Sequence, residues 1–291
     1  MIISMHIGAH CTAGGALMRG LLKNTGRLAE HGIVVPGPAR YRTIIPDVMK
    51  KVKGAPASID TQAMILDQIT EAENCDRLVM SLEDVICMPQ GIFADGKLYA
   101  KAEFRLSWLR NVFADHQMEF VLGVRNPASF IPAAFALEGG KRRYSDFIQN
   151  ADLDHLRWSR LITMIRAVCP DVAFKVYAFE DTPVIWGRLI REVAGVKGSV
   201  PLAGALDMIA TLMKPEGVTR LRAYLETHKP KNELQFQRIL GAFLDKYADP
   251  AMMEDEIDLP DWDDALIERL TATYEDDLYL IEGLPGVTFI S

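Results

Sequence analysis

The residues best suited to chemistry lie in a glycine-rich stretch near the start of the chain. The segment "MHIGAHCTAGGALMRG", residues 5–20, reads as a buried strand, a turn of small residues and the start of a helix. A helix that begins near Gly14 presents unpaired N–H groups and the positive end of its dipole. The small side chains of Ala13, Gly14, Gly15 and Ala16 let an anion approach that backbone closely. The sequence therefore predicts the backbone part of a phosphate or sulfate site.

The turn lacks the side chains of a loop that binds nucleoside triphosphates. Counted from Gly8, the pattern GxxxxGK[ST] would place its second glycine at Ala13 and its lysine at Gly14. A nucleotide kinase or NTPase is therefore the least favoured function. Taken alone, the turn also fits a purely structural role, in which small residues let a helix pack tightly on a strand.

Three further residues have the chemistry of acid–base or nucleophilic groups. His10 follows the first predicted strand, and Glu83 ends the apolar run "RLVMSLED", residues 77–84. Ligand sites of open α/β sheets lie at the carboxyl ends of strands, so either group is placed to take a proton from a hydroxyl. For His10 the alternative is that it only satisfies backbone groups. Cys11 is interpreted either as a reactive thiol at a helix N-terminus or as a small neutral filler.

The elements that position these residues alternate between strand and helix. Short apolar runs predict strands, and stretches with a 3.6-residue apolar period predict helices. Such alternation predicts an α/β fold with three layers, in which a largely parallel sheet carries helices on both faces. Strands are predicted over residues 1–8, 33–38, 77–84, 118–127 and 171–181, and helices over 15–31, 61–73 and 182–196.

The last third of the chain reads differently. After about Pro201 the strand pattern stops, and amphipathic helices are predicted over residues 215–228, 231–247 and 261–281. We expect one domain over residues 1–291, with residues 201–291 as its helical extension, packed on the sheet or capping the site. The acidic run at 252–264 is interpreted as a solvated loop and an acidic helix N-terminus.

Composition excludes several classes of protein. The 291 residues carry a net charge of −7, which argues against binding to a nucleic acid polymer. The four cysteines contain no CxxC pair, so neither a disulfide framework nor a metal site is expected. No apolar stretch is long enough to span a membrane, and the N-terminus lacks a signal-peptide pattern. We therefore predict a cytoplasmic protein.

Several motifs resemble, in order along the chain, those of the sulfotransferases that use 3'-phosphoadenylyl sulfate (PAPS). Residues 6–37 resemble the family's first motif, which in bacterial members reads like HIGxHKTGTTSLQxxLxxN. "MSLED" is similar to a strand-end Ser-x-Glu, and "VLGVRNPASFIPAAF", residues 121–135, is similar to the second donor motif. The positions in step with the first motif are His6, Gly8, His10, Thr12, Leu17, Asn24, Leu28, Gly32 and Pro36.

The resemblance implies a sulfotransferase-like fold of the P-loop type and a nucleotide donor. The donor would be PAPS and the product adenosine 3',5'-bisphosphate, with no metal. The acceptor would be a hydroxyl or amine of a carbohydrate or small molecule. Carried over by position, Arg125 would bind the 3'-phosphate of the donor, and the family's serine falls near Ala133. The first loop would hold the 5' sulfate–phosphate end at residues Cys11, Thr12, Ala13, Gly14, Gly15 and Ala16.

The sequence departs from the family at the charged and hydroxyl positions. The loop lysine falls on Cys11, and the two hydroxyl residues fall on Gly14 and Gly15. Losing one such donor costs an enzyme about 3–4 kcal/mol of transition-state stabilisation. Two hypotheses follow. Either the chain is an active sulfotransferase in which Arg19 or the "GGKRR" loop at 139–143 supplies the missing charge, or it is an inactive relative that binds a nucleotide, a sulfated ligand or a protein. The oligomeric state stays open.

Overall fold

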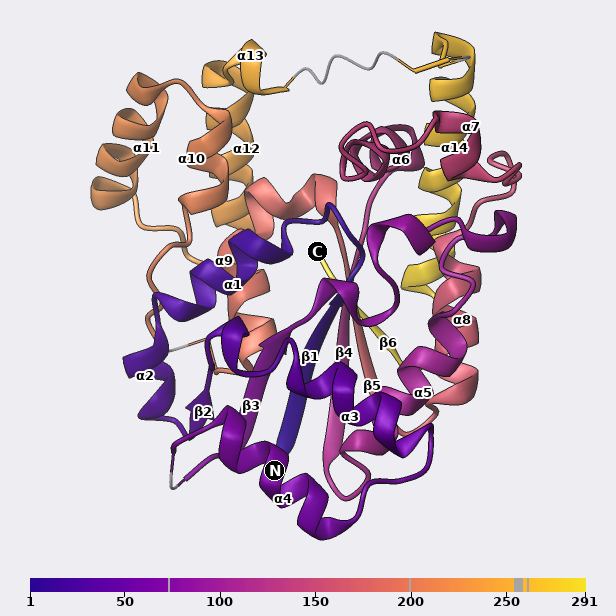
Figure 1. Ribbon diagram of the computed structural model, residues 1–291. Helices are drawn as coiled ribbons and strands as arrows, with labels where there is room; N and C mark the ends of the chain where they lie inside the picture. Colours follow the sequence, from indigo (N-terminus) through magenta and orange to yellow (C-terminus); the bar gives the residue numbers. More distant parts are fainter. Residues whose placement is uncertain (73, 199, 254–258, 261) are drawn as a thin grey trace.

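A six-stranded parallel sheet forms the centre of the protein. The computed structural model describes residues 1–72, 74–198, 200–253, 259–260 and 262–291 (Figure 1). All neighbouring strands run parallel in the order β2-β3-β1-β4-β5-β6, so the predicted α/β class with a parallel sheet is confirmed. The strands are β1 (Ile2–Gly8), β2 (Ile33–Val34), β3 (Arg77–Ser81), β4 (Gln117–Val124), β5 (Ala173–Ala178) and β6 (Val287–Ile290).

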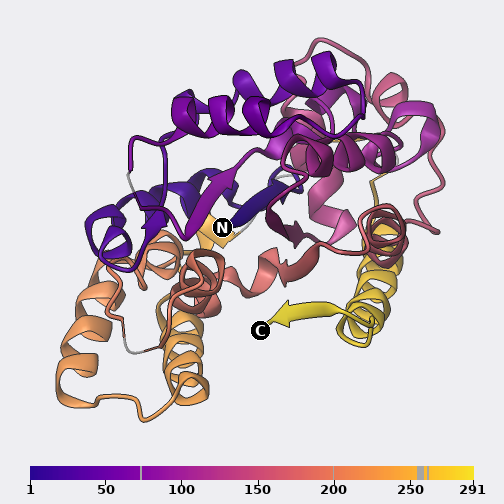
Figure 2. The same cartoon turned by 90° about the horizontal axis from the view of Figure 1, so that it is seen from below.

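Helices cover both faces of this sheet. Figures 1 and 2 show α3 (Ile44–Val52), α4 (Ile59–Ile69) and α5 (Ala102–Val112) on one face and α9 (Thr182–Ala194) on the other. The remaining helices are α1 (Gly14–Leu22), α2 (Thr25–Ala29), α6 (Pro127–Ala136), α7 (Tyr144–Ile148), α8 (Trp158–Val168), α10 (Asp207–Leu212), α11 (Pro215–Thr227), α12 (Glu233–Tyr247), α13 (Pro250–Met253) and α14 (Asp264–Glu282).

The central strand β1 is buried on both sides, which explains its continuous apolar run. Ile3, Met5 and Ile7 point to one face of the sheet, and Ser4 and His6 point to the other. Because both faces are covered, the two polar residues are as deeply buried as the apolar ones. Buried polar groups need hydrogen-bond partners, and each of the two belongs to a separate network across the sheet.

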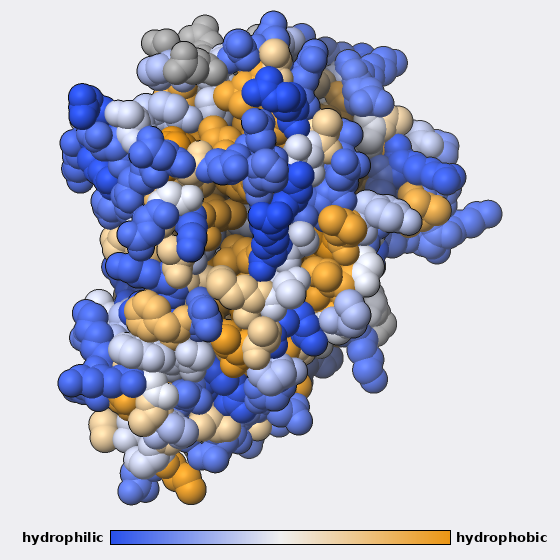
Figure 3. All heavy atoms as spheres, turned by 90° about the vertical axis from the view of Figure 1, so that its right-hand side faces the viewer, coloured by the Kyte–Doolittle hydropathy of each residue, from blue (hydrophilic) through white to orange (hydrophobic). Residues whose placement is uncertain are grey.

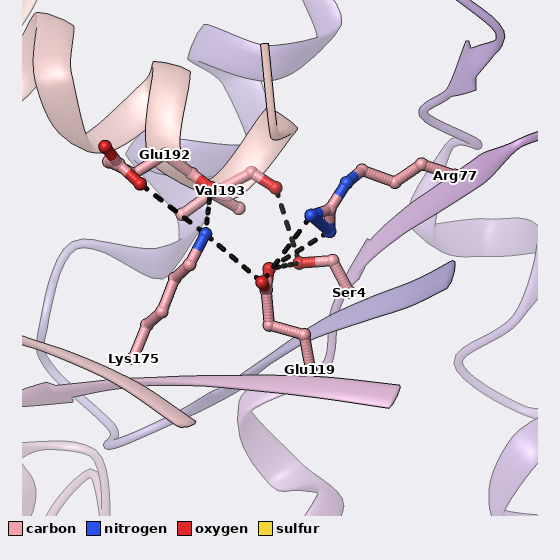
Figure 4. Close-up of polar contacts among 6 residues, drawn as sticks. All are labelled: Ser4, Arg77, Glu119, Lys175, Glu192 and Val193. Atoms are coloured by element: carbon pink, nitrogen blue, oxygen red, sulfur yellow. Dashed lines mark hydrogen bonds and ion pairs between the residues drawn. The ribbon is translucent and has the colours of Figure 1, made fainter. Parts of the chain in front are cut away.

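Ser4 belongs to a charged cluster near the amino ends of the strands (Figure 4). The carboxylate of Glu119 on β4 accepts hydrogen bonds from Ser4 (2.9 Å) and from Arg77 on β3 (3.1 Å), and it pairs with Lys175 on β5 at 3.2 Å. Lys175 also donates to the carbonyl oxygen of Glu192 on α9, at 2.7 Å. The cluster therefore joins four adjacent strands to the helix that covers them.

Two details of the first βα unit and the C-terminal part differ from prediction. The single helix predicted over 15–31 is two helices, α1 and α2, separated at Asn24. The side chain of Asn24 donates to the carbonyl oxygens of Gly20 and Ala203 and accepts from the N–H of Ala203, so it joins this break to the C-terminal part.

The prediction that no strand follows Pro201 is wrong, because β6 pairs in parallel with β5. Its four residues are too short for a periodic pattern to stand out.

The C-terminal helices are close to their predicted bounds and pack in two places. Helices α10, α11 and α12 share a separate hydrophobic cluster around Ile209, Leu221 and Leu240. Helix α14 instead packs beside α6 and α8, and its N-terminus is capped by Asp263, whose side chain accepts the N–H of Leu266 at 2.8 Å. Residue 73, where one predicted helix ends, and residues 254–258 and 261 of the acidic run lie outside the described residues.

Candidate functional site

The predicted site residues meet where the direction of chain winding changes. Strand β1 lies between β3 and β4, because the chain passes to β2 and β3 on one side and then crosses to β4 on the other. In open α/β sheets ligands bind at the carboxyl ends of strands at such a switch point. His10 follows β1, Glu83 follows β3 and Arg125 follows β4, so all three lie at this edge.

The loop between β1 and α1 is held in place by hydrogen bonds within it and to β4 and β5. The N–H of Ala9 donates to the carbonyl oxygen of Gly123 (2.9 Å), and the hydroxyl of Thr12 donates to the carbonyl oxygen of Ala9 (2.6 Å). The hydroxyl of Tyr177 on β5 donates to the carbonyl oxygen of Thr12 at 2.7 Å. The Thr12 side chain is fully buried and bonded within the loop, so its hydroxyl supports the loop from inside.

His6 lies beneath this loop as a neutral support. Its Nε2 is 3.0 Å from the hydroxyl of Tyr177 and its Nδ1 is 2.8 Å from that of Ser81. Burial lowers the pKa of His6 to about 4, so the ring is neutral near pH 7. Tyr177 reaches His6 across β4 because residue 123 is glycine. A Cβ there would lie 2.6 Å from both the Tyr177 ring and the Thr12 hydroxyl oxygen.

His10 is bound on both ring nitrogens. The hydroxyl of Tyr99 accepts the backbone N–H of His10 (3.0 Å) and lies 2.8 Å from its Nδ1, while Nε2 lies 3.1 Å from Oδ1 of Asp84. Because the Asp84 carboxylate only accepts, the proton of the neutral ring is assigned to Nε2, and Nδ1 then accepts from the Tyr99 hydroxyl. In this state His10 has no open nitrogen for a substrate proton. It positions Asp84 and the loop.

Glu83 lies at the N-terminus of α1. Its side chain accepts the backbone N–H of Gly14, and a Cβ on Gly14 would lie 1.8 Å from Oε1 of Glu83. Burial raises the pKa of the Glu83 carboxyl, Asp84 adds to that effect, and His10 and the Gly14 N–H oppose it. A half-buried carboxyl with a raised pKa at a strand end has the properties of a general acid or base.

Arg125 joins the loop to the start of α6. Its side chain is 8% exposed, and it donates through Nε to the hydroxyl of Ser129 (2.9 Å) and through an Nη to the carbonyl oxygen of Cys11 (3.1 Å). Its guanidinium lies 4.5 Å from the centre of the Phe179 ring. The indole N–H of Trp158 donates to the Arg125 carbonyl oxygen at 2.9 Å, which fixes the backbone as well.

The first turn of α1 keeps part of an anion-binding surface. The first intrahelical bond runs from Leu17 to Ala13, which leaves the N–H groups of Gly15 and Ala16 without an intrahelical acceptor. Arg19 is exposed, and its Nη1 lies 3.7 Å from the position of a Cβ on Gly15. Its guanidinium therefore lies back over the start of the helix.

The other predicted residues take less direct positions. Burial raises the pKa of Cys11 to about 11, so its thiol is neutral and the reading as a reactive thiolate is wrong. Ala133 lies on α6 one turn beyond Ser129, and the hydroxyl that binds Arg125 belongs to Ser129. In the loop after α6, the exposed Arg143 bonds to the Asp146 carboxylate, and the half-buried Arg142 donates to the carbonyl oxygens of Asp146 and Gln90.

Sequence reasoning missed Tyr99, Tyr177, Asp84 and Ser129 as site residues. Asp84 and Ser129 carry a weak signal, because each lies within four residues of a predicted site residue. The two tyrosines carry none, since they come from segments 89 and 165 residues away from the loop residues they bind. Their roles exist only because the sheet and its connections bring those segments to one edge.

Comparison of the chain with protein-family models, with curated proteins and with solved structures returned no match. Within the described ranges, no helix is both long and apolar enough to cross a membrane. The same part of the chain contains no group of three or more histidine, cysteine, aspartate or glutamate side chains placed to hold a metal ion. The function must therefore be argued from the geometry of the site.

Proposed function

We propose that this protein has a sulfotransferase-like fold of the P-loop type and transfers a sulfuryl group from PAPS to a hydroxyl or amine of a carbohydrate or small molecule. The observation that carries the proposal is the meeting of Arg125 and the N-terminus of α1 at the switch point of a parallel sheet. A guanidinium and a helix N-terminus both favour phosphate and sulfate oxygens. The start of α1 precedes Arg125 in the chain, as the first donor motif precedes the second in the sulfotransferases that the sequence resembles.

The donor would bind across the loop. Arg125 with Ser129 would hold its 3'-phosphate, because the guanidinium fork suits phosphate oxygens and Ser129 orients it. The N–H groups of Gly15 and Ala16 would hold the 5' sulfate–phosphate end. Arg19, whose guanidinium lies over Gly15, would supply the charge that the lysine of the family motif supplies elsewhere.

Glu83 is the group best placed to act as base. The acceptor hydroxyl would lose its proton to the Glu83 carboxylate as its oxygen forms a bond to sulfur. The bond between sulfur and the 5'-phosphate oxygen breaks, and adenosine 3',5'-bisphosphate leaves with the electron pair. A raised pKa makes the carboxyl a better proton acceptor than an exposed glutamate.

One observation favours a second function, binding without transfer. The Glu83 carboxylate accepts the N–H of Gly14, where a donor phosphate would otherwise bind, and Cys11 supplies no charge. An ionised carboxylate at that position repels a second anion. In this alternative the protein binds a nucleotide, a sulfated ligand or a partner, and it has lost the transfer step.

The donor site is tested by calorimetric titration with adenosine 3',5'-bisphosphate and with adenosine 5'-monophosphate. We expect micromolar binding of the bisphosphate. Because lysine cannot reproduce the two-pronged contact, Arg125→Lys should weaken bisphosphate binding by about tenfold or more and leave monophosphate binding unchanged. The exposed Arg222→Lys is the control. Failure of the folded wild type to bind at millimolar bisphosphate, or an equal loss for both nucleotides, would contradict the assignment.

Glu83→Gln separates transfer from binding. Removing the charge beside Gly14 should tighten bisphosphate binding, by about tenfold if the repulsion is partly screened. The same change should lower sulfuryl transfer from radiolabelled PAPS to a mixed panel of sugars and phenols by about 100-fold or more. Bisphosphate binding without any transfer in the wild type would favour the second function.

A further inference from the structure

A cleft of about 880 Å³ is lined in part by Leu82 and Asp84, the residues on either side of the proposed base in the chain. Its walls are the segment that follows β3, the start of α5, and α3 with the residues before it. Asp84 forms part of the wall, and the same Asp84 accepts the hydrogen bond from His10. A molecule in this cleft would therefore lie next to the loop, one residue away from Glu83.

The charge of the cleft is positive. Four cationic side chains line it against two carboxylates. Asp47 pairs with Lys50 at 3.6 Å, and Asp84 accepts the hydrogen bond from His10 at 3.1 Å. Among the described residues, Arg42 and Lys101 have no carboxylate within ion-pair distance. The cationic residues are Arg42, Lys50, Lys101 and Arg105.

Arg105 adds a cation that is not at the rim. It is half-buried, and its Nε donates to the carbonyl oxygen of Val85 at 2.9 Å, which ties the guanidinium to the segment that follows β3. Burial lowers the pKa of Arg105, and no carboxylate among the described residues pairs with it. A part-buried guanidinium with only a carbonyl partner is stabilised by an incoming anion.

The cleft also offers apolar surface beside these charges. Met88 is 58% exposed and Phe104 is 42% exposed, and both lie on its lining. An aromatic ring and a thioether pack well on the apolar face of a sugar ring. The size of the cleft is that of a site for a small molecule or a short oligosaccharide rather than for a single inorganic ion.

We infer that this cleft binds the acceptor, and that the acceptor is a carbohydrate carrying a negatively charged oxygen group, either a carboxylate or a sulfate ester. The charged group faces Arg42, Lys101 and Arg105, the sugar ring packs on Phe104 and Met88, and the reacting hydroxyl points towards Asp84 and Glu83. The role as acceptor rests on the proposed transfer function. The preference for an acidic sugar rests on the cleft alone.

The test measures binding of three tetrasaccharides by calorimetry without nucleotide. The probes are a hyaluronan tetrasaccharide, which carries carboxylates, neutral chitotetraose, and chitotetraose sulfated at O6. We expect at least one acidic probe to bind about tenfold more tightly than the neutral one, and more weakly as salt increases. Which acidic probe binds better identifies the charged group. Equal binding of all three, or no binding at about 10 mM, overturns the inference.

Charge reversal locates the site. Arg42→Glu/Lys101→Glu changes two exposed side chains of the cleft, and Lys229→Glu/Lys231→Glu makes the same charge change on exposed residues between α11 and α12. The cleft variant should lose about tenfold or more in affinity for the acidic probe, and the control variant should keep it. Equal effects of the two variants would place the binding elsewhere.

The bisphosphate titration separates the two proposals. Both charge-reversal variants should keep their affinity for adenosine 3',5'-bisphosphate within about threefold, because neither touches the loop or Arg125. Binding of the acidic tetrasaccharide in this cleft without binding of the bisphosphate would support the cleft as a site for acidic sugars and contradict its role as an acceptor site. Binding of the bisphosphate without binding of any acidic probe would support the donor site and contradict the proposed role of the cleft.

Discussion

Two histidines four residues apart in the same motif have different roles because their surroundings differ. His6 is fully buried, and its ring nitrogens contact only the hydroxyl groups of Ser81 and Tyr177, so burial lowers its pKa. His10 is also buried, but its Nε2 faces a half-exposed carboxylate. The first supports the loop as a neutral group, and the second links the loop to the wall of the cleft. A residue type therefore predicts a chemical capacity, and the surroundings decide its use.

The burial of His6 makes the stability of the protein depend on pH. The folded protein holds the pKa of His6 at about 4 instead of 6.5, so between those values the unfolded chain takes up a proton that the folded chain does not. Stability should therefore fall as the pH falls through this window, by up to about 3 kcal/mol at its lower end. Urea unfolding of the wild type and of His6→Gln, between about pH 7 and 4, measures the difference.

The exposed His31→Gln is the control for this series and should leave the pH profile of the wild type in place. If His6→Gln follows the same profile as the wild type, the ring of His6 is not held neutral by burial. Ser81 and Tyr177, which bond to its ring nitrogens, carry no charge near pH 7. The Glu83 carboxyl near the ring has a raised pKa and acts in the opposite direction, so the same series on Glu83→Gln measures its contribution.

At the scale of the element, the start of α1 is shaped by two adjacent glycines with different surroundings. A Cβ on Gly14 would overlap the Glu83 carboxylate at 1.8 Å and approach the His6 ring at 2.8 Å. A Cβ on Gly15 would meet only Arg19, at 3.7 Å. The resemblance aligned both positions with hydroxyl residues, but only Gly15 has room for a side chain. The two positions are therefore not equivalent.

Alanine substitution at each glycine makes this difference measurable. Gly15→Ala should raise the free energy of unfolding by up to about 1 kcal/mol, since alanine favours a helix and meets little here. Gly14→Ala should instead lower it by about 1–3 kcal/mol, because the new methyl group displaces Glu83 or shifts the helix. Chemical denaturation of both variants provides the comparison. Stabilisation by both substitutions would show that Glu83 does not occupy the helix start.

The same scale shows how the C-terminal part supports the site. Asp277 on α14 is buried and accepts the N–H groups of Trp158 and Ser159, so it caps the N-terminus of α8. Asn126, next to Arg125, donates to the hydroxyl of Thr271 on α14 at 2.9 Å. Helix α14 therefore fixes the elements on both sides of Arg125, although it lies about 140 residues later in the chain.

At the scale of the whole molecule, the sheet carries a polar network at each end. The network of His6, Ser81, Tyr177 and Thr12 lies near the carboxyl ends of the strands and supports the site. The cluster around Glu119 lies near the amino ends and joins four strands to α9 (Figure 4). On the outer face that carries α8 and α14, apolar side chains gather towards the middle, with polar ones around them (Figure 3).

Glu119 should therefore matter for the stability of the whole fold. Glu119→Gln leaves Arg77 and Lys175, whose side chains are 13% and 14% exposed, without the carboxylate that they share. Removing one partner of a buried ion pair costs about 3–5 kcal/mol. Glu192→Gln, in the same cluster but 39% exposed, should cost less than about 1 kcal/mol. Comparable losses in denaturant unfolding for the two variants would contradict a central role for Glu119.

Two surface grooves of similar size differ in their chemistry and in their distance from the loop. The groove between α8 and α14 has a volume of about 700 Å³, and exposed Tyr279 and Leu280 lie on its lining. It is apolar and lies away from the loop. The cleft beside Glu83 is charged and adjoins the loop. Position relative to the switch point, and not size, makes the second one the candidate for a substrate.

The sequence by itself determined the α/β class, the approximate positions of five strands, and the helix start after β1. It did so because buried strands and amphipathic helices impose local periods that survive in one dimension. It also named His10 and Glu83, which lie at or just after the carboxyl ends of predicted strands, while Arg125 was named through the resemblance to the second donor motif. The tertiary structure alone decided that Glu83 binds the N–H of Gly14 and that Ser129 binds Arg125. It also decided that Tyr99 and Tyr177 hold the loop and that β6 forms one edge of the sheet. Those contacts join segments up to 165 residues apart. They depend on the order and connections of the strands, which a local sequence pattern does not contain.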